Sequence, residues 1–321
     1  MMDPVAETEA LFGRMLDGEL DDSEIADILV GMARKGETGQ DIAGAVLAMR
    51  ARMETITAPA NAIDVCGTGG DGQHSLNVST AVAILVAACD VPVAKHGNRA
   101  ASSKAGGADT LEALGLNLAN ASERSEETLC DIGIAFLFAQ AHHPAMKHVM
   151  PIRKSLGIRT IFNLIGPLAN PASVKRQLVG VASPDLVPTY RDAMTLLGGD
   201  AALIVSGNEG LDEISIAGPS RLAAINLAGI GDEITPDAAG LPCHPLEAMR
   251  GGDAQYNASA LRSLLHGKAG AYRDAVLINT AGALIVAGEA SNWREGVGEA
   301  AEAIDKGLAK ALLDCWIDAC K

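Results

Sequence analysis

The sequence has few aromatic and few basic side chains. Aromatic residues make up only 3% of its 321 positions, and 25 Lys and Arg stand against 40 Asp and Glu, which gives a formal net charge of -15. Non-specific binding to nucleic acid or to an anionic membrane surface depends on Lys and Arg, so the composition argues against both kinds of partner. Any phosphate group must therefore be bound by a local site.

Patterns typical of metal clusters, disulfides and export are also missing. The six cysteines include no C-x-x-C pair, and the seven histidines include no H-x-x-x-H pattern. Most of the cysteines lie in apolar sequence, which favours buried thiols in a reducing cytosol. The acidic amino terminus has no basic segment followed by an apolar one, and the apolar stretch 78–89 is too short to span a bilayer. We therefore expect a cytoplasmic protein without a membrane segment.

The first sixty residues have the periodicity of amphipathic helices. Asp22 and the Thr38–Asp41 pair are candidate helix caps, and each precedes a stripe of Ile, Leu, Val and Met at helical spacing. We predict a helical domain over residues 1–60, joined by a helical segment near 146–157. The stripes favour an intramolecular core over a dimer interface, and both remain open.

After Pro59 the sequence alternates between strand and helix patterns. Apolar segments at 63–66, 91–95, 134–138, 178–182 and 201–206 predict strands. We therefore predict an α/β fold for residues 61–321, with a mostly parallel sheet flanked by helices. The last seventy residues indicate helices and one buried strand near 275–279. Ligands of such sheets bind beyond the carboxyl ends of the strands.

The segment Asp64–Gly72 ends a predicted strand in a run of glycines, and Asn77–Thr80 then open an apolar helix. The unpaired backbone N–H groups of such a loop and helix start can bind a phosphate. The spacing also satisfies the dinucleotide pattern G-x-G-x-x-G, but the helix starts late and the next strand ends in a base. No Lys-Ser or Lys-Thr pair follows, which excludes a Walker loop. A simple tight turn is the remaining alternative.

Four further segments carry charged or rigid groups at predicted strand ends and in loops. Lys95–Arg99, followed by Ser102, Ser103 and Lys104, has the composition of an anion site. The neighbouring carboxylates Asp212 and Glu213 fit the oxygen ligands of Mg²⁺. Arg153 can bind a carboxylate through two parallel hydrogen bonds. The apolar, strand-like piece 162–171 is broken by Gly-Pro and could line a pocket or turn a corner. Each feature alone is also compatible with ordinary surface.

Taken in order, these segments resemble the anthranilate phosphoribosyltransferase family, which belongs to the nucleoside-phosphorylase-like transferases. The resemblance runs nearly end to end and rests on long motifs. These are Arg34–Thr38, the Gly67 loop, Asn77–Thr80, Lys95–Arg99, Gly157–Thr160 with the Gly-Pro-Leu that follows, and Gly210–Glu213. It implies transfer of phosphoribosyl from phosphoribosyl diphosphate to the amino group of anthranilate, with Mg²⁺ as cofactor. It also implies a homodimer formed through the amino-terminal helices.

The resemblance further implies which residues bind each ligand. Phosphoribosyl diphosphate would contact Gly67, Gly70, Asp71, Ser75, Asn77, Val78, Ser79, Thr80, Lys95, His96, Gly97, Asn98, Arg99, Ala100, Ala101, Ser102, Ser103 and Gly107. Anthranilate would contact Gly67, His96, Asn98, Arg153 and Pro167. Ser79, Asp212 and Glu213 would hold Mg²⁺. No dedicated general base is expected, because the aromatic amine needs orientation more than deprotonation.

The sequence departs from the family pattern in a few places, and two other functions remain open. Gly107 stands where relatives commonly carry Ser, Ser206 replaces a common His, and Ala100-Ala101 is less polar than usual. The first alternative function is a pyrimidine-nucleoside phosphorylase of the same fold, against which Arg153 and the Lys95–Ser103 segment argue. The second is a non-catalytic nucleic-acid-binding relative, which would need a basic face.

Overall fold

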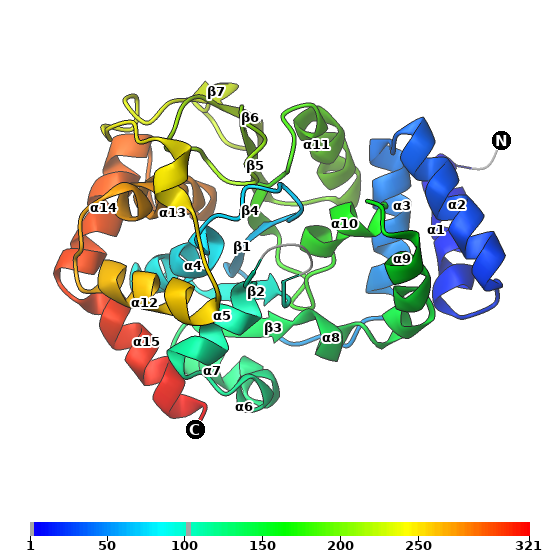
Figure 1. Cartoon of the computed structure of the whole chain (residues 1–321), viewed down its shortest axis with the longest axis horizontal. Coiled ribbons are helices and arrows are strands. Elements are labelled where there is room, and N and C mark those ends of the chain that lie inside the picture. Colours follow the sequence, from blue (N-terminus) through cyan, green and yellow to red (C-terminus); the bar gives the residue numbers. More distant parts are fainter. Residues whose placement is uncertain (1–2, 101–103) are drawn as a thin grey trace.

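The computed structural model describes residues 3–100 and 104–321, in which a seven-stranded sheet has helices on both faces and a helical bundle at one end (Figure 1). The strand order is β3-β2-β1-β4-β5-β6-β7. Neighbouring strands from β3 to β5 are parallel, whereas β6 is antiparallel to both of its neighbours, β5 and β7. The strands are β1 (Ile63–Gly67), β2 (Val93–Gly97), β3 (Ile134–Phe138), β4 (Arg176–Gly180), β5 (Ala201–Gly207), β6 (Ser220–Ile225) and β7 (Glu233–Ile234). The predicted α/β class and mostly parallel sheet are confirmed.

Side chains of the central strands alternate between two hydrophobic cores, as strand geometry requires. Leu203 and Val205 of β5 lie in the core beneath α4 (Val78–Ala88) and α13 (Ala271–Ala287). Ala202 and Ile204 lie in the opposite core beneath α11 (Leu186–Leu197). Burial on both faces explains why the parallel strands read as continuous apolar runs.

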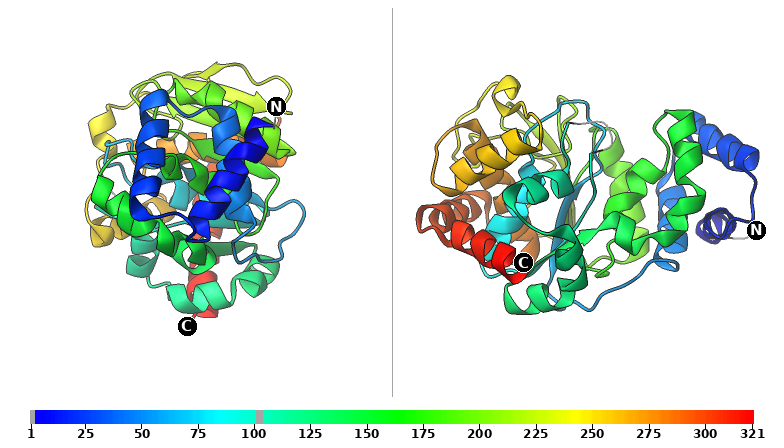
Figure 2. Two further views of the ribbon diagram at one scale, coloured as in Figure 1. Left: turned by 90° about the vertical axis from the view of Figure 1, so that its right-hand side faces the viewer. Right: turned by 60° about the horizontal axis from the view of Figure 1, so that its bottom comes forward.

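The bundle consists of α1 (Pro4–Leu16), α2 (Asp22–Lys35) and α3 (Gly39–Arg50), with α9 (Met150–Leu156) packed against α2. The capping box predicted at Thr38 and Asp41 is present, whereas α2 is capped by Asp21 rather than by Asp22. Helix α3 packs on α11, and one hydrophobic core runs from the bundle to the sheet. Helices α1 and α2 therefore lie on the outer side of the bundle, away from the sheet (Figure 2).

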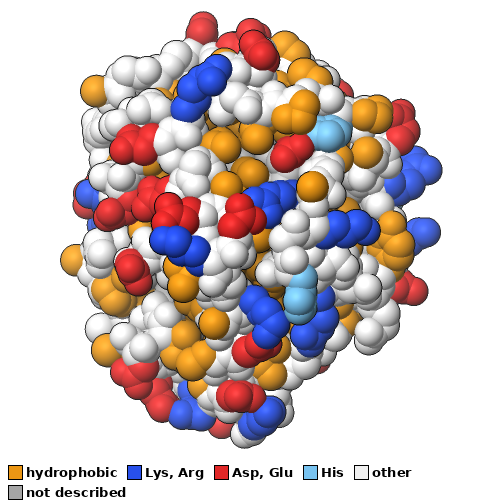
Figure 3. All heavy atoms as spheres, turned by 90° about the vertical axis from the view of Figure 1, so that its left-hand side faces the viewer, with side chains coloured by type: hydrophobic (Ala, Val, Ile, Leu, Met, Phe, Trp, Pro, Cys, Tyr) orange, Lys and Arg blue, Asp and Glu red, His pale blue; other side chains and the backbone are white. Residues whose placement is uncertain are grey.

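The remaining helices surround the strands. Among them α13 contacts α4 and α14, and α15 contacts α4. They are α5 (Gly107–Leu114), α6 (Leu118–Glu123), α7 (Ser125–Asp131), α8 (Ala139–His142), α10 (Phe162–Ile165), α12 (Ala254–Leu265), α14 (Trp293–Asp305) and α15 (Leu308–Ala319), with 3-10 turns at Pro144–His148, Gly166–Leu168 and Leu246–Met249. Figure 3 shows acidic and basic side chains side by side on the face that includes α12, α14 and α15.

Several local predictions are wrong. The strand expected at 275–279 lies within α13, which is buried on every side and mostly apolar, so its sequence resembles that of a buried strand. The strand expected at 91–95 begins at Val93, because the turn after α4 continues to Val91 and Pro92 has no N–H group. The strand-like piece 162–171 forms α10 and a 3-10 turn.

The cysteine prediction also fails in part. Cys66 and Cys320 are buried and Cys89 is partly buried, but Cys130, Cys243 and Cys315 are exposed on helix and loop surfaces. Over residues 3–100 and 104–321, no helix combines the length and the apolar character needed to cross a bilayer.

Candidate active site

The glycine loop leaves β1 at the carboxyl edge of the sheet and leads into α4. The backbone φ angles of Gly69, Gly70 and Gly72 are 67°, 78° and 72°, values that residues other than Gly rarely adopt. At Gly67 the constraint is steric, because a Cβ there would lie 2.2 Å from Oδ2 of Asp212. Asn77 precedes α4 without capping it through its side chain, so the first N–H groups of α4 are left to other acceptors.

Two carboxylates from the distant turn after β5 close on this loop. Oδ2 of Asp212 accepts a hydrogen bond of 2.7 Å from the N–H of Gly69, and Oε1 of Glu213 accepts one of 3.2 Å from the N–H of Ser79. Oδ2 of Asp71 is buried, and none of the residues that the structure describes donates a hydrogen bond to it. The fold therefore brings the predicted loop and the predicted carboxylate pair together, across 143 sequence positions.

The pKa values of these carboxyl groups reflect crowding of negative charge. Burial and the nearby Asp71 raise the pKa of Asp212 to about 7. Burial and Asp212 also raise the pKa of Glu213, and the charge of Lys95 partly offsets this. The cluster thus carries more negative charge than its own surroundings neutralise.

Lys95 connects β2 to the strand and helix on either side of the glycine loop. Its side chain is buried, and its Nζ donates to the carbonyl oxygen of Val65 at 2.8 Å and to Oγ of Ser79 at 3.3 Å. Its ammonium group therefore lies next to the start of α4, where a bound anion would also lie.

Asp64, within β1, organises the backbone beneath the site and was not predicted as a functional residue. It is fully buried, and it accepts hydrogen bonds from the N–H of His96 at 3.1 Å and from Nδ2 of Asn170 at 2.8 Å. Burial raises the pKa of Asp64. The signal that could have revealed it is an acidic residue inside an otherwise apolar strand.

His96 and His143 form a buried imidazole pair. Their Nε2 atoms are 3.3 Å apart, and Nδ1 of His96 is 3.0 Å from the carbonyl oxygen of Gly166. Burial lowers the pKa of His96 to about 3 and that of His143 to about 4, so both rings are neutral near pH 7. His143, at the end of α8, was missed because nothing in the sequence links it to His96.

Arg153 lies on α9 with its guanidinium half-buried. Cζ is 5.3 Å from the ring centroid of Phe162, and Nη2 is 3.4 Å from Oδ1 of Asn163. Nη1 lies 3.6 Å from Sδ of Met150, so its polar contacts within the described part of the chain are neutral groups. Burial lowers the pKa of Arg153 without removing its charge. The guanidinium therefore keeps its charge for an anionic ligand.

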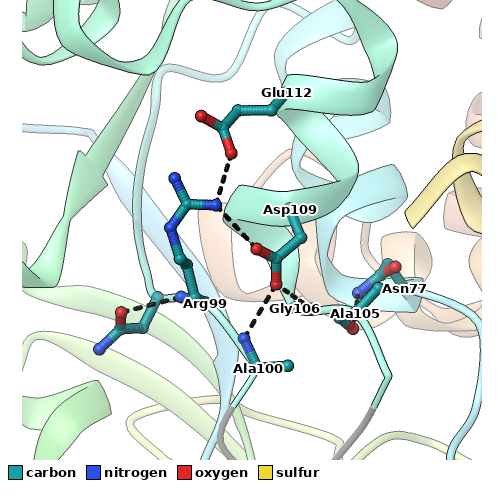
Figure 4. A network of polar contacts seen from close by, with 8 residues as sticks. Asn77, Arg99, Ala100, Ala105, Gly106, Asp109 and Glu112 are labelled. Atoms are coloured by element: carbon teal, nitrogen blue, oxygen red, sulfur yellow. Dashed lines mark hydrogen bonds and ion pairs between the residues drawn. The ribbon is translucent and has the colours of Figure 1, made fainter. Parts of the chain in front are cut away.

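The segment after β2 directs the side chain of Arg99 toward Asp109 and Glu112 (Figure 4). Nη1 of Arg99 is 2.9 Å from Asp109 and 2.5 Å from Glu112, both on α5, and the guanidinium lies over the ring of Phe138. Oδ2 of Asp109 accepts hydrogen bonds from the N–H groups of Ala100 and Gly106. The side chain of Arg99 is thus held by α5. Ala101, Ser102 and Ser103 lie outside the described residues.

The other predicted residues border the same region with different exposures. Gly97 ends β2 and Asn98 follows it, and Ser75 pairs with Arg250 in an isolated β-bridge. Val78 and Thr80 are buried in the first turn of α4, and Pro167 is buried in the 3-10 turn that contains Gly166. Gly97, Asn98, Val78 and Thr80 therefore lie on the segments that directly follow or end β1 and β2.

The structure shows the surroundings of Gly107 and Ser206, two positions at which the sequence departs from the family pattern. A Cβ added at Gly107 would lie 3.1 Å from Oγ1 of Thr80, a buried hydroxyl that makes no hydrogen bond within residues 3–100 and 104–321. Ser206 is fully buried and its Oγ is 3.5 Å from the carbonyl oxygen of Leu211. Ser206 therefore supports the turn that carries Asp212 and does not itself reach the glycine loop.

Comparison with known proteins agrees with this geometry. Two family models match, "Glycosyl transferase family, helical bundle domain" over residues 5–53 and "Glycosyl transferase family, a/b domain" over residues 59–310. The chain is 64% identical to the anthranilate phosphoribosyltransferase of Novosphingobium aromaticivorans, over 98% of this chain and 96% of that protein. It is 62% identical to that of Sphingopyxis alaskensis, over 95% of this chain and 92% of that protein.

Solved structures give the same result. The crystal structure of anthranilate phosphoribosyltransferase from Thermus thermophilus matches with a TM-score of 0.94 and 38% identity, covering 100% of this chain and 96% of that one. The enzyme from Saccharomyces cerevisiae in complex with PRPP and Mg matches with a TM-score of 0.89 and 29% identity, covering 98% of this chain and 93% of that one.

Proposed function

The chain belongs to the anthranilate phosphoribosyltransferases of the glycosyl transferase family, and from this premise we propose which residues carry each part of the reaction. The reaction transfers a phosphoribosyl group from phosphoribosyl diphosphate to anthranilate in tryptophan biosynthesis. The relatives reported above are neither pyrimidine-nucleoside phosphorylases nor nucleic-acid-binding proteins, so both alternatives are set aside.

The sugar donor binds where the glycine loop, the start of α4 and Lys95 meet. The observation that carries this proposal is that hydrogen bonds from the N–H groups of Gly69 and Ser79 hold Asp212 and Glu213 against the glycine loop and the start of α4. Candidate cation ligands therefore lie beside a loop and helix start suited to an anion. Departure of diphosphate leaves positive charge on the sugar and negative charge on the leaving group. Backbone N–H groups and Lys95 stabilise that negative charge.

Mg²⁺ is held by Ser79, Asp212 and Glu213, next to the buried carboxylate of Asp71. The residues fit a cation, because Asp71 has an unpartnered buried oxygen and the pKa values of Asp212 and Glu213 are raised by crowded negative charge. Among the described residues, no group of three or more His, Cys, Asp and Glu is arranged as a complete metal site. Diphosphate and water would supply the other ligands, as is usual for Mg²⁺, and the bound ion would offset negative charge on the leaving group.

Anthranilate binds on the other side of the sugar site, with its carboxylate at Arg153. The guanidinium is charged, half-buried and surrounded by neutral groups, which favours an anionic partner. Asn98, His96, Pro167 and Gly67 complete the path to the sugar. We assign no general base, since the low pKa values of His96 and His143 make both rings weak bases near pH 7.

The domain division, the oligomer and the location in the cell complete the proposal. Residues 1–60 and the segment 146–157 form a helical domain and residues 61–321 the catalytic domain, which is consistent with the contacts of α9 on α2. A homodimer would use the outer faces of α1 and α2 (Figure 2). A cytoplasmic location is expected, because a charged sugar diphosphate does not cross an apolar bilayer unaided.

A fluorescence assay tests acceptor, donor and reaction together. The purified protein is mixed with phosphoribosyl diphosphate, anthranilate and Mg²⁺, and formation of phosphoribosylanthranilate is followed. Phosphorolysis of thymidine and uridine is measured beside it. We expect turnover in the first assay, lost on chelation of Mg²⁺; turnover confined to the nucleosides would overturn the proposal.

A further inference from the structure

Asn257 is a buried polar residue that connects a distant loop to the start of α4. It lies in the first turn of α12 and is 2% exposed. Its Oδ1 accepts a hydrogen bond of 2.8 Å from the N–H of Gly252, and its Nδ2 donates one of 2.9 Å to Oδ1 of Asn77. Asn77 is one of the proposed sugar-donor residues, 180 positions earlier in the chain.

The segment before α12 is fixed against the glycine loop by its backbone. The N–H of Leu76 donates to the carbonyl oxygen of Met249 at 2.8 Å, and the N–H of Gly251 donates to that of His74 at 2.8 Å. A Cβ at Gly251 would lie 2.7 Å from the carbonyl oxygen of Ser75, so this close approach requires glycine. Gly252 is therefore held in place independently of Asn257.

The donor at Gly252 determines the orientation of both amides. A backbone N–H can only donate, so the side of Asn257 that faces Gly252 must be its oxygen, and its NH₂ group faces Asn77. That NH₂ group in turn requires the oxygen of Asn77 on its side. Oγ1 of the fully buried Thr110 also contacts this oxygen, at 2.5 Å. An inverted Asn77 would place two NH₂ groups against each other.

The consequence is that Asn77 turns its NH₂ group toward the segment after β2. Its Nδ2 donates to the carbonyl oxygen of Ala105 at 3.3 Å, and Figure 4 shows the two residues side by side. Its backbone carbonyl is held separately by the hydroxyl of Tyr272 at 2.9 Å. The side chain thus presents a donor, which suits a phosphate oxygen, and not an acceptor, which would repel one.

We propose that Asn257 is a positioning residue for the sugar donor. The N–H of Gly252 fixes the orientation of the Asn257 amide, and the Asn257 amide in turn orients Asn77, so that Asn77 presents a hydrogen-bond donor to phosphoribosyl diphosphate. We call this chain of hydrogen bonds the relay. This inference rests on the proposed function of the glycine-loop site. Asn257 itself does not touch the substrate, and it acts only through Asn77.

The test compares binding of the two substrates in Asn257 variants. Asn257→Asp keeps the acceptor for Gly252 but sets an oxygen against the oxygen of Asn77, and Asn257→Leu removes the relay without adding charge. In both we expect KM for phosphoribosyl diphosphate, and its Kd by calorimetry with Mg²⁺, to rise about ten- to a hundredfold. KM for anthranilate should change less than about twofold. Asn117→Asp, at the exposed N-cap of α6, is the matched control for charge and should leave both constants unchanged.

A double mutant separates positioning from general damage. In an Asn77→Ala background the relay has no amide to orient, so adding Asn257→Leu should leave KM for phosphoribosyl diphosphate unchanged. A further rise of the same factor would overturn the proposal, as would an unchanged KM in Asn257→Leu alone. If Asn257→Leu does not fold, Thr110→Val removes the other contact to the same oxygen. It should raise this KM about threefold, and an equal rise for anthranilate would contradict the proposal.

The wild-type protein distinguishes this inference from the proposed function. If calorimetry finds no binding of phosphoribosyl diphosphate with Mg²⁺ to the wild type, the proposed sugar site is wrong. If the wild type binds it and the Asn257 variants bind it equally well, only the relay is wrong.

Discussion

The two sides of the candidate site differ in how they hold charge. The carboxylate side consists of Asp71, Asp212 and Glu213, whose negative charges are crowded and only partly offset. The imidazole side consists of His96, His143 and Arg153, where the rings are neutral and the guanidinium has neutral neighbours. One side is incomplete without a cation and the other without an anion. Each ligand therefore completes the side whose unbalanced charge is opposite to its own.

The two sides also respond to pH with opposite signs. The raised pKa of Asp212 means that its contribution to stability is present below pH 3.8 and is lost as the pH rises through about 7. The lowered pKa of His143 means that its contribution is present above pH 6.5 and is lost as the pH falls toward about 4. Substitutions on the two sides should therefore change the dependence on different ligands and should change the pH dependence with opposite signs.

The largest effect is expected from the carboxylate side. Glu213→Gln removes a charged ligand from the proposed Mg²⁺ site, and kcat/KM should fall by about a hundred- to a thousandfold, equivalent to several kcal/mol. The Mg²⁺ concentration needed for half-maximal activity should rise. A titration of activity with Mg²⁺ measures both, with the exposed Glu233→Gln as a control. An unchanged titration would remove Glu213 from the metal site.

The next effect belongs to the imidazole side and should be confined to one substrate. Arg153→Ala should raise KM for anthranilate about ten- to a hundredfold, the range expected for a charged hydrogen-bonded pair, and leave KM for phosphoribosyl diphosphate nearly unchanged. Arg153→Lys keeps the charge but loses the planar pair of donors, so it should recover only part of the loss. Equal effects on both substrates would show that Arg153 does not bind the anthranilate carboxylate.

The two sides also differ in how well they can be predicted from the sequence. The carboxylate side depends on local signals, a glycine run after a strand and adjacent acids after another, and parallel strands bring such ends together. The imidazole side depends on contacts that no local pattern contains. His143 meets His96 across 47 positions, and Asn170 meets Asp64 across 106. Only the folded backbone brings these pairs together.

The direction in which a side chain points also cannot be predicted from the sequence. Arg99 follows β2 directly and was predicted in the sugar site, yet Asp109 and Glu112 hold its guanidinium toward α5. The buried helix α13 was misread in part as a strand because a helix that is apolar all round has no distinguishing period. The direction of the Arg99 side chain and the burial of α13 have the same origin, since burial and partner choice are set by tertiary packing.

A further effect of the carboxylate side should appear in the stability of the metal-free protein. Asp212→Asn removes a buried charge whose pKa is raised to about 7, so at pH 8 it should increase the free energy of unfolding by about 4 kcal/mol. The gain should vanish near pH 4, where Asp212 is protonated in the folded protein. Urea unfolding in the presence of a chelator measures it, with the exposed Asp232→Asn as control. A gain that persists at pH 4 would indicate that charge is not the cause.

The smallest effect concerns the pH dependence of the imidazole side. His143→Gln removes a ring that stays neutral in the folded protein down to about pH 4 but takes up a proton near pH 6.5 when unfolded. Below pH 6.5 the wild type should therefore lose up to about 1.4 kcal/mol of unfolding free energy per pH unit from this residue, and the variant should not. Urea unfolding at intervals between pH 6.5 and 4.5 measures the slope. The exposed His266→Gln should keep the wild-type slope, and an identical slope in His143→Gln would contradict the neutral buried pair.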